Sequence, residues 1–381
     1  MAAIVTGANT NWLCTGKEIF SALLKAIDAA QEFVYLEIYI YSPGSLAEHF
    51  RETLVRAQQR GAHVKILIDA LGSYSLPSDF WQFLVAAGGQ VRRFNPLSLN
   101  RLGIRNHRKL LVCDNQVAFV GGFNIATEYE GDGITSGWRD IGLRIEGHLV
   151  GELAASFEEM FARADFQHKR FVRLRRTTAN KVVRAQNEQL LLSGPGRGLS
   201  PIKRALHRDL RSARLVQIIV AYFLPSWRLR RQLGRIVRQG GRVQLLLAGK
   251  SDVNLSQLAA KSLYPRLLKA GIEIFEYQPQ ILHAKLLIFD ELVYVGSANL
   301  DPRSFYINYE LMIRFRNQQM AQQAREVFQS NLGHCQAVTL DSWRRSHSLW
   351  RRLKQHWAYL LLARLDPYIA NRQWRALRLH R

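Results

Sequence analysis

The sequence predicts an α/β protein made of two similar halves that are related by a pseudo-twofold axis. Stretches rich in β-branched and aromatic residues alternate with stretches of helical spacing, which is typical of an α/β fold. This alternation occurs twice along the 381 residues. The motif His-x-Lys-x-x-x-x-Asp also occurs twice, at 107–114 and at 283–290. We therefore expect the functional site at the interface between the two halves.

Each half is predicted to contain strand, helix, strand, helix and strand, followed by a hairpin. The first strands are predicted at 32–41 and 216–224, where β-branched and aromatic residues dominate. The helices that follow are predicted at 45–61 and 227–241, where helical spacing ends in glycine. Two later segments of the first half have counterparts in the second: 57–69 is similar to 237–248, and 84–96 is similar to 267–279.

The two motifs are predicted to lie on β-hairpins, because apolar runs flank a polar pair at Asp114-Asn115 and again at Asp290-Glu291. Seven residues of strand at roughly 3.3 Å each place Asp114 about 23 Å from His107. We therefore interpret Asp114 and Asp290 as turn residues and not as catalytic groups.

The histidine and lysine of each motif are two residues apart, and side chains alternate between the faces of a strand. Each pair therefore shares a face and can bind one anion; the pairs are His107 with Lys109 and His283 with Lys285. The return strands bring small and amide side chains back beside them. Glycine lets the backbone approach a ligand, while serine and asparagine add hydrogen bonds to phosphate oxygens. The predicted phosphate-binding residues are Gly121, Gly122, Asn124, Gly296, Ser297 and Asn299.

Chain length and composition fit two domains of ordinary size, with 48% apolar residues. A basic, weakly apolar stretch separates the repeats and predicts a linker. The expected division is 1–167 for the first half, 168–189 for the linker, 190–340 for the second half and 341–381 for a basic tail. The three cysteines have no metal-ligand spacing and favour a reducing compartment. No apolar run is long enough to span a bilayer and no signal-peptide layout is present, so we expect a cytoplasmic protein without a membrane span.

The formal charge of +23 predicts attraction to a polyanion, either nucleic acid or an anionic membrane surface. In the tail, Trp343, Trp350 and Trp357 recur every seven residues in a segment rich in arginine. A basic amphipathic helix with tryptophan on its apolar face suits the headgroup layer of a bilayer. The alternative, a helix that packs on the protein's own core, stays open. Pro367 is expected to end or break this helix.

Two such motifs in one chain, each followed by Gly-[Gly/Ser]-x-Asn, resemble the phospholipase D superfamily. Within it the chain is similar to the bacterial cardiolipin synthases, in particular the short form, cardiolipin synthase B, which lacks N-terminal membrane spans. The similar stretches are AIDAAQEFVYLEIYIY, RGAHVKILIDALGS, WRDIGLRIEG, AYFLPS, LYPRLLKAGIEIFEY and GSANLDPRSFYINYEL. They extend from about residue 18 to about residue 335. The resemblance implies two phospholipase D-like α/β/α halves with one active site at their interface.

The resemblance also implies a mechanism. Imidazole can act as nucleophile and as proton carrier near neutral pH. By analogy with the family, His107 attacks phosphorus to form a phosphohistidine and His283 protonates the departing alcohol; the pseudo-symmetry leaves the exchange of these roles open. Lys109 and Lys285 would neutralise the phosphate oxygens. We expect no cofactor and no metal ion.

Each histidine also needs a partner that fixes its tautomer. In the family this is an acidic residue further along the chain. Asp140, 33 residues after His107, and Glu310, 27 residues after His283, occupy the matching positions. Each acid precedes an apolar run that could bring it behind the hairpin of its own half, so we expect Asp140 beside His107 and Glu310 beside His283.

The expected reaction is phosphatidyl transfer from phosphatidylglycerol to a second phosphatidylglycerol or another alcohol. The alternative is a phosphodiesterase that hydrolyses phospholipid or nucleic acid, because the same motifs and charge would serve it. The tryptophan-bearing tail and the synthase-like stretches make nucleic acid the less favoured substrate. An inactive lipid-binding module is disfavoured because both motifs are complete. The expected place of action is the cytoplasmic face of the cell membrane, with the protein bound peripherally.

Overall fold

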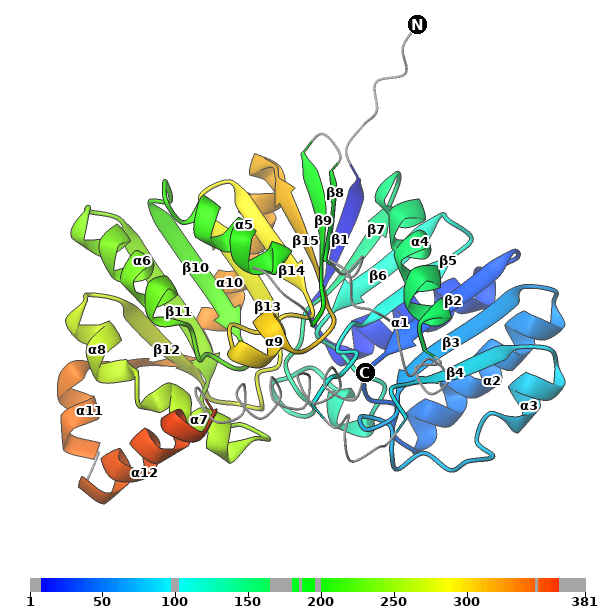
Figure 1. Cartoon of the computed structure of the whole chain (residues 1–381), viewed down its shortest axis with the longest axis horizontal. Helices are drawn as coiled ribbons and strands as arrows, with labels where there is room; N and C mark the ends of the chain where they lie inside the picture. Colours follow the sequence, from blue (N-terminus) through cyan, green and yellow to red (C-terminus); the bar gives the residue numbers. More distant parts are fainter. Residues whose placement is uncertain are drawn as a thin grey trace, which may run out of the picture.

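A computed structural model describes the chain over residues 8–96, 103–164, 180–184, 187–195, 200–346 and 349–362. Two β-sheets stand side by side, the first built from the first half of the sequence and the second from the second half (Figure 1). Helices lie against both sheets. The predicted α/β fold with two similar halves is confirmed.

The first sheet has seven strands in the order β1-β7-β6-β5-β2-β3-β4. Three neighbouring strands are parallel: β2 (Phe33–Ile38), β3 (His63–Asp69) and β4 (Gln90–Phe94). The remaining strands join them by antiparallel pairs: β1 (Asn9–Leu13), β5 (Leu110–Cys113), β6 (Val117–Gly121) and β7 (Gly142–Glu146).

The second sheet has nine strands in the order β16-β12-β11-β10-β13-β14-β15-β9-β8. Matching β9 to β15 with β1 to β7 in chain order makes the two strand orders the same, and β8 and β16 extend the edges of the second sheet. The matched strands are β9 (Glu188–Ser193), β10 (Leu215–Val220), β11 (Arg242–Ala248), β12 (Glu273–Tyr277), β13 (Lys285–Phe289), β14 (Leu292–Gly296) and β15 (Glu310–Arg316). The edge strands are β8 (Lys181–Arg184) and β16 (Cys335–Val338). The repeat in the sequence therefore corresponds to a repeated strand order in the structure.

Each sheet has helices on both faces. On the first sheet, α1 (Gly16–Ala29), α2 (Ser45–Gln59) and α3 (Gln82–Ala86) share a core with one face, and α4 (Leu149–Ala162) packs on the other. The second sheet carries α5 (Pro201–Asp209), α6 (Trp227–Arg238), α7 (Asn254–Lys261), α8 (Tyr264–Lys269), α11 (Leu340–Ser346) and α12 (Leu349–Leu360) on one side and α10 (Gln318–Leu332) on the other. Two short helices, η1 (Thr127–Tyr129) and α9 (Pro302–Tyr306), follow the hairpins. The α/β/α layering of each half is therefore present.

Helix α1 illustrates how the sequence sets these elements. The Thr15 hydroxyl accepts from the Glu18 N–H and the Glu18 carboxylate accepts from the Thr15 N–H, which forms a capping box. The apolar residues Ile19, Leu23 and Ile27 recur every four residues and are fully buried. Each such side chain contributes roughly 1.5–3 kcal/mol through burial, so this face fixes the helix on the sheet.

A single apolar core joins the two halves. It combines α4 and the first hairpin with α10 and the second hairpin, so that residues such as Val120 and Leu153 belong to the same buried cluster as Val295 and Phe328. The strands β6 and β14 lie against each other within it. This shared core holds the two motif-bearing hairpins in a fixed relative position.

Two details differ from the sequence-based expectation. Residues 181–184 form β8 and residues 188–193 form β9, so the end of the segment predicted as linker is part of the second sheet. The linker residues 168–179 lie outside the described part of the chain.

The three tryptophans of the tail do not share one helix face, as the sequence had suggested. Trp343 lies on α11, is only 4% exposed and packs on Tyr264 of α8, with ring centroids 5.1 Å apart. The physical reason is that β16 pairs with β12 and returns the chain to the sheet edge next to α8. Trp350 and Trp357 lie on the separate helix α12, where both are exposed.

Pro367 lies outside the described residues. Within the described ranges, no helix combines the length and apolar character needed to cross a membrane.

Candidate active site

The hairpins place the motif aspartates in their turns, as predicted. Asp114 and Asp290 have φ angles of 54° and 50°, in the left-handed region. Asp114 accepts backbone hydrogen bonds from Gln31 (2.8 Å), Glu32 (2.9 Å) and Phe33 (2.8 Å). These partners lie more than 80 positions away and open β2, so the carboxylate ties the turn to the neighbouring strand and not only to itself. Asp290 does the same for the start of β10.

Replacing Asp114 by asparagine is expected to destabilise the protein more than the same change at Asp290. Both Asp114 oxygens accept hydrogen bonds, and an amide would turn one of them into a donor facing the Gln31 N–H. At Asp290 one carboxylate oxygen accepts from the N–H groups of both Arg214 and Leu215, so the amide oxygen of asparagine could keep both hydrogen bonds. We expect a loss of about 1–2 kcal/mol at Asp114 and less at Asp290, since asparagine tolerates positive φ. Melting temperature and initial rate measure this; a stable but inactive Asp114→Asn enzyme would contradict it.

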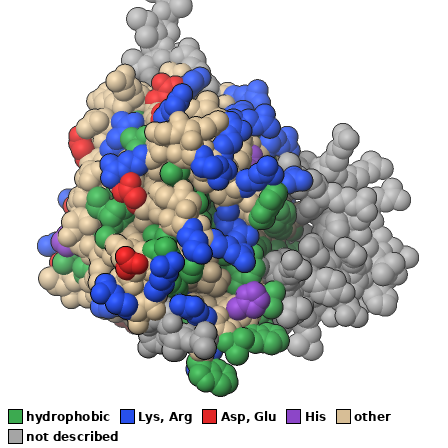
Figure 2. Space-filling view, turned by 90° about the vertical axis from the view of Figure 1, so that its left-hand side faces the viewer, with side chains coloured by type: hydrophobic (Ala, Val, Ile, Leu, Met, Phe, Trp, Pro, Cys, Tyr) green, Lys and Arg blue, Asp and Glu red, His purple; other side chains and the backbone are tan. Residues whose placement is uncertain are grey.

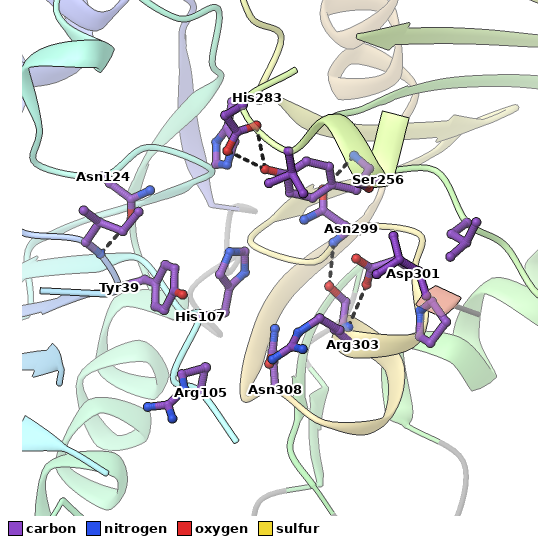
Figure 3. Close-up of a pocket in the computed structure, with 18 of the residues that line it drawn as sticks. Tyr39, Arg105, His107, Asn124, Ser256, His283, Asn299, Asp301, Arg303 and Asn308 are labelled. Atoms are coloured by element: carbon purple, nitrogen blue, oxygen red, sulfur yellow. Dashed lines mark hydrogen bonds between the residues drawn. The ribbon is translucent and has the colours of Figure 1, made fainter. Parts of the chain in front are cut away.

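The catalytic candidates His107 and His283 face one cavity between the halves. The cavity has a volume of about 320 Å³, and it is lined by both histidines together with Asn124 and Asn299. Figure 3 shows these four side chains surrounding the same space, each half supplying one histidine and one asparagine. The sequence motifs, 176 residues apart, are thus brought to one site.

The halves exchange short backbone bridges beside this cavity. Asn106 pairs with Tyr309, and Leu282 pairs with Arg139. His107 N–H donates to the Tyr309 carbonyl (3.0 Å), and His283 N–H donates to the Arg139 carbonyl (2.7 Å). Each histidine is therefore fixed against the segment of the other half that immediately precedes an acidic residue.

The acids consequently pair across the interface. Glu310 Oε2 lies 3.1 Å from His107 Nδ1, and Asp140 Oδ2 lies 2.7 Å from His283 Nδ1. The expectation that each acid serves the histidine of its own half is wrong, because the backbone bridges bring the acid of the opposite half behind each imidazole. With Nδ1 held by a carboxylate, Nε2 is the ring atom that each histidine can turn to chemistry. Nε2 of His283 also lies 3.1 Å from Lys285 Nζ and 3.4 Å from the Tyr129 hydroxyl.

The two motif lysines lie behind the imidazoles and are almost fully buried. Lys109 Nζ donates to the carbonyl oxygen of His107 (2.7 Å), and Lys285 Nζ donates to that of His283. Lys285 Nζ also lies 2.8 Å from Nδ1 and 3.1 Å from Nε2 of His283. The lysines therefore supply positive potential next to both rings.

Burial controls the protonation of the site. It lowers the pKa of His107 to about 4, with Glu310 opposing and Lys109 reinforcing the effect. The pKa of His283 also lies well below its ordinary value, because burial and then Lys285 disfavour the imidazolium. Burial raises the pKa of Asp140 to about 7 and lowers that of Lys285 to about 8. His107 is thus a neutral base at neutral pH, whereas His283 stands beside two groups that titrate near neutral pH.

The lowered pKa of His107 predicts a pH-dependent stability. The folded state binds a proton at His107 less readily than the unfolded state does, so this contribution is present above pH 6.5 and is lost as the pH falls toward 4. Between pH 7 and pH 5, the wild type should lose about 2 kcal/mol more than His107→Asn in free energy of unfolding. Urea unfolding of both proteins at the two pH values measures this. Equal losses in the two proteins would contradict it.

The asparagines hold the rims of the cavity. Asn124 Oδ1 accepts from Ile40 N–H (3.0 Å), and Asn299 Oδ1 accepts from Tyr222 N–H (3.3 Å), so each side chain fixes the end of a central strand. The Asn124 amide also donates to the hydroxyl of Tyr129 (2.7 Å), which lies 3.3 Å from His283 Nδ1. Asn124 is therefore linked to the histidine of the other half through Tyr129.

The glycines and Ser297, which the sequence predicts to bind phosphate, are not among the residues that line the cavity. A Cβ atom at Gly122 would collide with the Asp140 carboxylate, and one at Gly121 would collide with the Ile141 carbonyl oxygen. Gly296 is confined in the same way by the carbonyl oxygen of Leu311. Ser297 Oγ donates to Glu310. Gly122 therefore makes room for the Asp140 carboxylate, and Ser297 holds that of Glu310.

The two halves differ beneath their histidines. Asn106 donates from its backbone to Asp69 (2.9 Å) and from its side chain to Glu37 (2.7 Å), which also pairs with Arg108 (3.1 Å). At the matching positions the second half has the apolar residues Leu282, Ala248, Ile219 and Ala284. The segment that carries His107 and leads into β5 is therefore held by a buried polar network that the second half lacks at these positions.

Sequence reasoning missed the aromatic lining of the cavity. The ring of Tyr39 lies 5.0 Å from that of His107, and those of Tyr129 and Trp138 lie 5.3 Å and 5.7 Å from that of His283. Tyr222 reaches Asp252 through its hydroxyl (2.8 Å), and both also line the cavity. Tyr39 and Tyr222 follow the ends of β2 and β10, and the carboxyl ends of parallel strands are where ligands bind in open α/β sheets. The position of Tyr39 and Tyr222 just after these strand ends is the sequence signal that could have identified them as cavity residues.

Comparisons with known proteins agree with this geometry. The family described as "Cardiolipin synthase, PLD-like domain" matches residues 23–164 and 206–332. Cardiolipin synthase 1 of Bacillus cereus is 29% identical over 92% of this chain and 72% of its own length. Cardiolipin synthase of Clostridium perfringens is 32% identical over 85% of this chain and 70% of its own length.

The fold agrees as well. The crystal structure of phosphatidylserine synthase from Haemophilus influenzae matches with a TM-score of 0.75 at 13% identity and covers 95% of this chain and 94% of that one. Polyphosphate kinase from Porphyromonas gingivalis matches with a TM-score of 0.60 at 14% identity, over 88% of this chain and 49% of that one. The chain belongs to the cardiolipin synthase family, phosphatidyltransferase enzymes of the phospholipase D superfamily.

Proposed function

We propose that the protein transfers a phosphatidyl group from phosphatidylglycerol to a second phosphatidylglycerol or another alcohol, through a phosphohistidine, at the cytoplasmic face of the cell membrane. The observation that carries the proposal is the pair of imidazoles on one cavity, each held at Nδ1 by a carboxylate and backed by a lysine. Such a pair supplies one nucleophile and one proton carrier for a phosphodiester.

In the first step, His107 Nε2 attacks phosphorus and the bond from phosphorus to the glycerol oxygen breaks. His283 Nε2 gives its proton to that oxygen, so glycerol leaves as a neutral alcohol. The phosphatidyl group is then bound to His107. Lys109 and Lys285 offset the negative charge that develops on the phosphate oxygens.

In the second step, His283 removes the proton of the incoming hydroxyl, whose oxygen attacks phosphorus. The bond between phosphorus and His107 Nε2 breaks, and His107 returns to its neutral form. The product is cardiolipin or a related lipid, and the proton has been passed from the incoming to the departing alcohol.

The pKa values support His107 as the nucleophile. A nucleophilic imidazole must be neutral, and burial lowers the pKa of His107 to about 4. A proton carrier must exchange its proton near ambient pH, and Asp140 and Lys285, with pKa values of about 7 and 8, stand beside His283. Burial and Lys285 hold the pKa of His283 well below its ordinary value, and a phosphodiester anion in the cavity would raise it back toward this range. The polar network that holds Asn106 also restrains the adjacent His107.

The test is mass spectrometry of lipids after the purified protein is incubated with phosphatidylglycerol vesicles. We expect cardiolipin and free glycerol in equal amounts. Phosphatidic acid as the main product would indicate hydrolysis in place of transfer. Cleavage of DNA with no lipid product would favour the nuclease alternative, to which the charge of +23 also points.

Catalysis is expected to be independent of divalent metal ions, because Lys109 and Lys285 lie against the two histidines and can offset the charge that a divalent ion would otherwise neutralise. Activity should persist after exhaustive dialysis against EDTA. The matched control is the same dialysis followed by addition of Mg²⁺, Mn²⁺ or Ca²⁺. Loss of activity on chelation with rescue by one of these ions would refute metal independence.

A further inference from the structure

Helix α12 packs on the protein by one face only. Gln355 and Ala358 are buried, and Arg230 of α6 donates a hydrogen bond to the Tyr359 hydroxyl (3.2 Å). The helix lies along α7 (Figure 1). This face accounts for the attachment of α12 to the second half.

A second apolar face of the same helix is exposed. Trp350 is 73% exposed and Trp357 is 65% exposed, and Leu353 and Leu361 are also exposed. Their spacing of three, four and four residues places Trp350, Leu353 and Trp357 on one stripe of the helix, and Leu361, directly after its end, continues that stripe. We call these four residues the α12 stripe. A helix with one buried and one exposed apolar face needs a second partner, because contiguous exposed apolar surface marks an interaction site.

The charge around the stripe selects the kind of partner. Arg352 and Lys354 on α12 and Arg344 and Arg345 on α11 are exposed, and α12 contains no acidic residue. Figure 2 shows hydrophobic side chains gathered at the lower edge of this side of the molecule, with Lys and Arg side chains spread above them. Basic side chains that flank tryptophan and leucine suit the headgroup layer of an anionic bilayer.

The end of the chain segment that carries the stripe reaches the catalytic cavity. Leu362, which follows α12 closely, lines the cavity together with Leu224 and Val253, and Val253 directly precedes α7. The cavity, at about 320 Å³, is at the low end for small-molecule sites and can hold a phosphodiester and its head group. Two long acyl chains do not fit with them, so a phospholipid bound there must leave its chains outside, on the side of these apolar residues.

We propose that the α12 stripe inserts into the headgroup layer of an anionic phospholipid bilayer and sets the cavity mouth at the membrane surface. Lipid head groups then reach His107 and His283 while their acyl chains stay in the bilayer. The role of the stripe in substrate access rests on the proposed function; the binding of anionic bilayers does not. Nucleic acid is the less suitable occupant, because a leucine and tryptophan stripe offers phosphates no hydrogen bonds beyond the indole N–H.

Binding is tested with the full-length protein carrying His107→Ala, so that no turnover alters the vesicles. Sedimentation is measured with phosphatidylcholine vesicles and with vesicles of equal parts phosphatidylcholine and phosphatidylglycerol. We expect binding to the anionic vesicles only, and a loss of at least about tenfold in affinity when Trp350→Ser and Trp357→Ser are combined. The matched control is Phe83→Ser, an exposed aromatic on α3, which should bind as well as the parent protein.

Turnover measurements distinguish a defect in membrane binding from a defect in the catalytic reaction. With His107 intact, the double tryptophan variant should lose turnover on vesicles but keep wild-type turnover of short-chain phosphatidylglycerol dispersed as monomers, since neither tryptophan lines the cavity. Unchanged vesicle binding in the variant, equal wild-type binding to neutral vesicles, or a loss of DNA binding in place of vesicle binding would overturn the inference. If the wild type binds anionic vesicles through the stripe yet turns over no lipid in either form, the docking surface stands and the proposed function fails.

Discussion

His107→Ala and His283→Ala are each expected to reduce turnover by about a thousandfold or more, because each imidazole performs a step that the other cannot perform alone. The double variant should be scarcely slower than either single variant, as expected for residues that act as a unit. Initial rates of lipid product formation measure this. Melting temperatures at neutral pH check that both single variants keep their fold.

The roles of the two histidines separate with a substrate whose leaving group needs no acid, such as phosphatidyl-p-nitrophenol. In His283→Ala, His107 can still attack, but no base activates the incoming alcohol, so one equivalent of nitrophenol should be released and phosphatidyl-enzyme should accumulate. In His107→Ala neither should occur. A burst in His107→Ala and none in His283→Ala would show that the roles are exchanged.

The fold was predictable because its signals are local. The alternation of β-branched and helical stretches, and the polar pairs at Asp114 and Asp290, depend on residues close together in sequence. The turn positions and the two hairpins follow from them. The convergence of His107 and His283 on one cavity was inferred from duplication, which implies a shared interface.

The details in which the structure differs from the sequence-based interpretation depend on tertiary contacts. The spacing between Gly122 and His107 suggested a phosphate cradle, but Gly122 is small because the Asp140 carboxylate lies against it. A seven-residue repeat put Trp343 with Trp350, but β16 turns the chain so that Trp343 joins the core beside Tyr264. A local sequence pattern does not show which distant element packs against a given residue.

The crossed acids are the clearest example of this limit. Spacing along the chain favours Asp140 for His107, since both belong to the same half. The structure pairs His107 with Glu310 because the bridge between Asn106 and Tyr309 joins the halves beside the cavity. An exchange of this kind makes each half incomplete alone: neither hairpin has the carboxylate that orients its own imidazole.

The crossed pairing gives the last expected result. If Asp140 orients His283, then Asp140→Asn should behave as a partial His283→Ala: with phosphatidyl-p-nitrophenol it should show a burst and accumulate phosphatidyl-enzyme. If Glu310 orients His107, then Glu310→Gln should slow the burst itself. We expect each variant to lose roughly ten- to a thousandfold in turnover of phosphatidylglycerol, because the amide leaves geometry in place while disturbing the tautomer.

Rapid-quench measurement of the burst rate and of the later steady rate distinguishes the two variants, and Asp290→Asn serves as the matched control because its carboxylate lies in a turn. The pairing within each half predicts the opposite assignment: Asp140→Asn would slow the burst, and Glu310→Gln would accumulate phosphatidyl-enzyme. The two arrangements differ in which step each acid controls, and a slow burst in Asp140→Asn would refute the crossed site even if both variants lost the same overall activity.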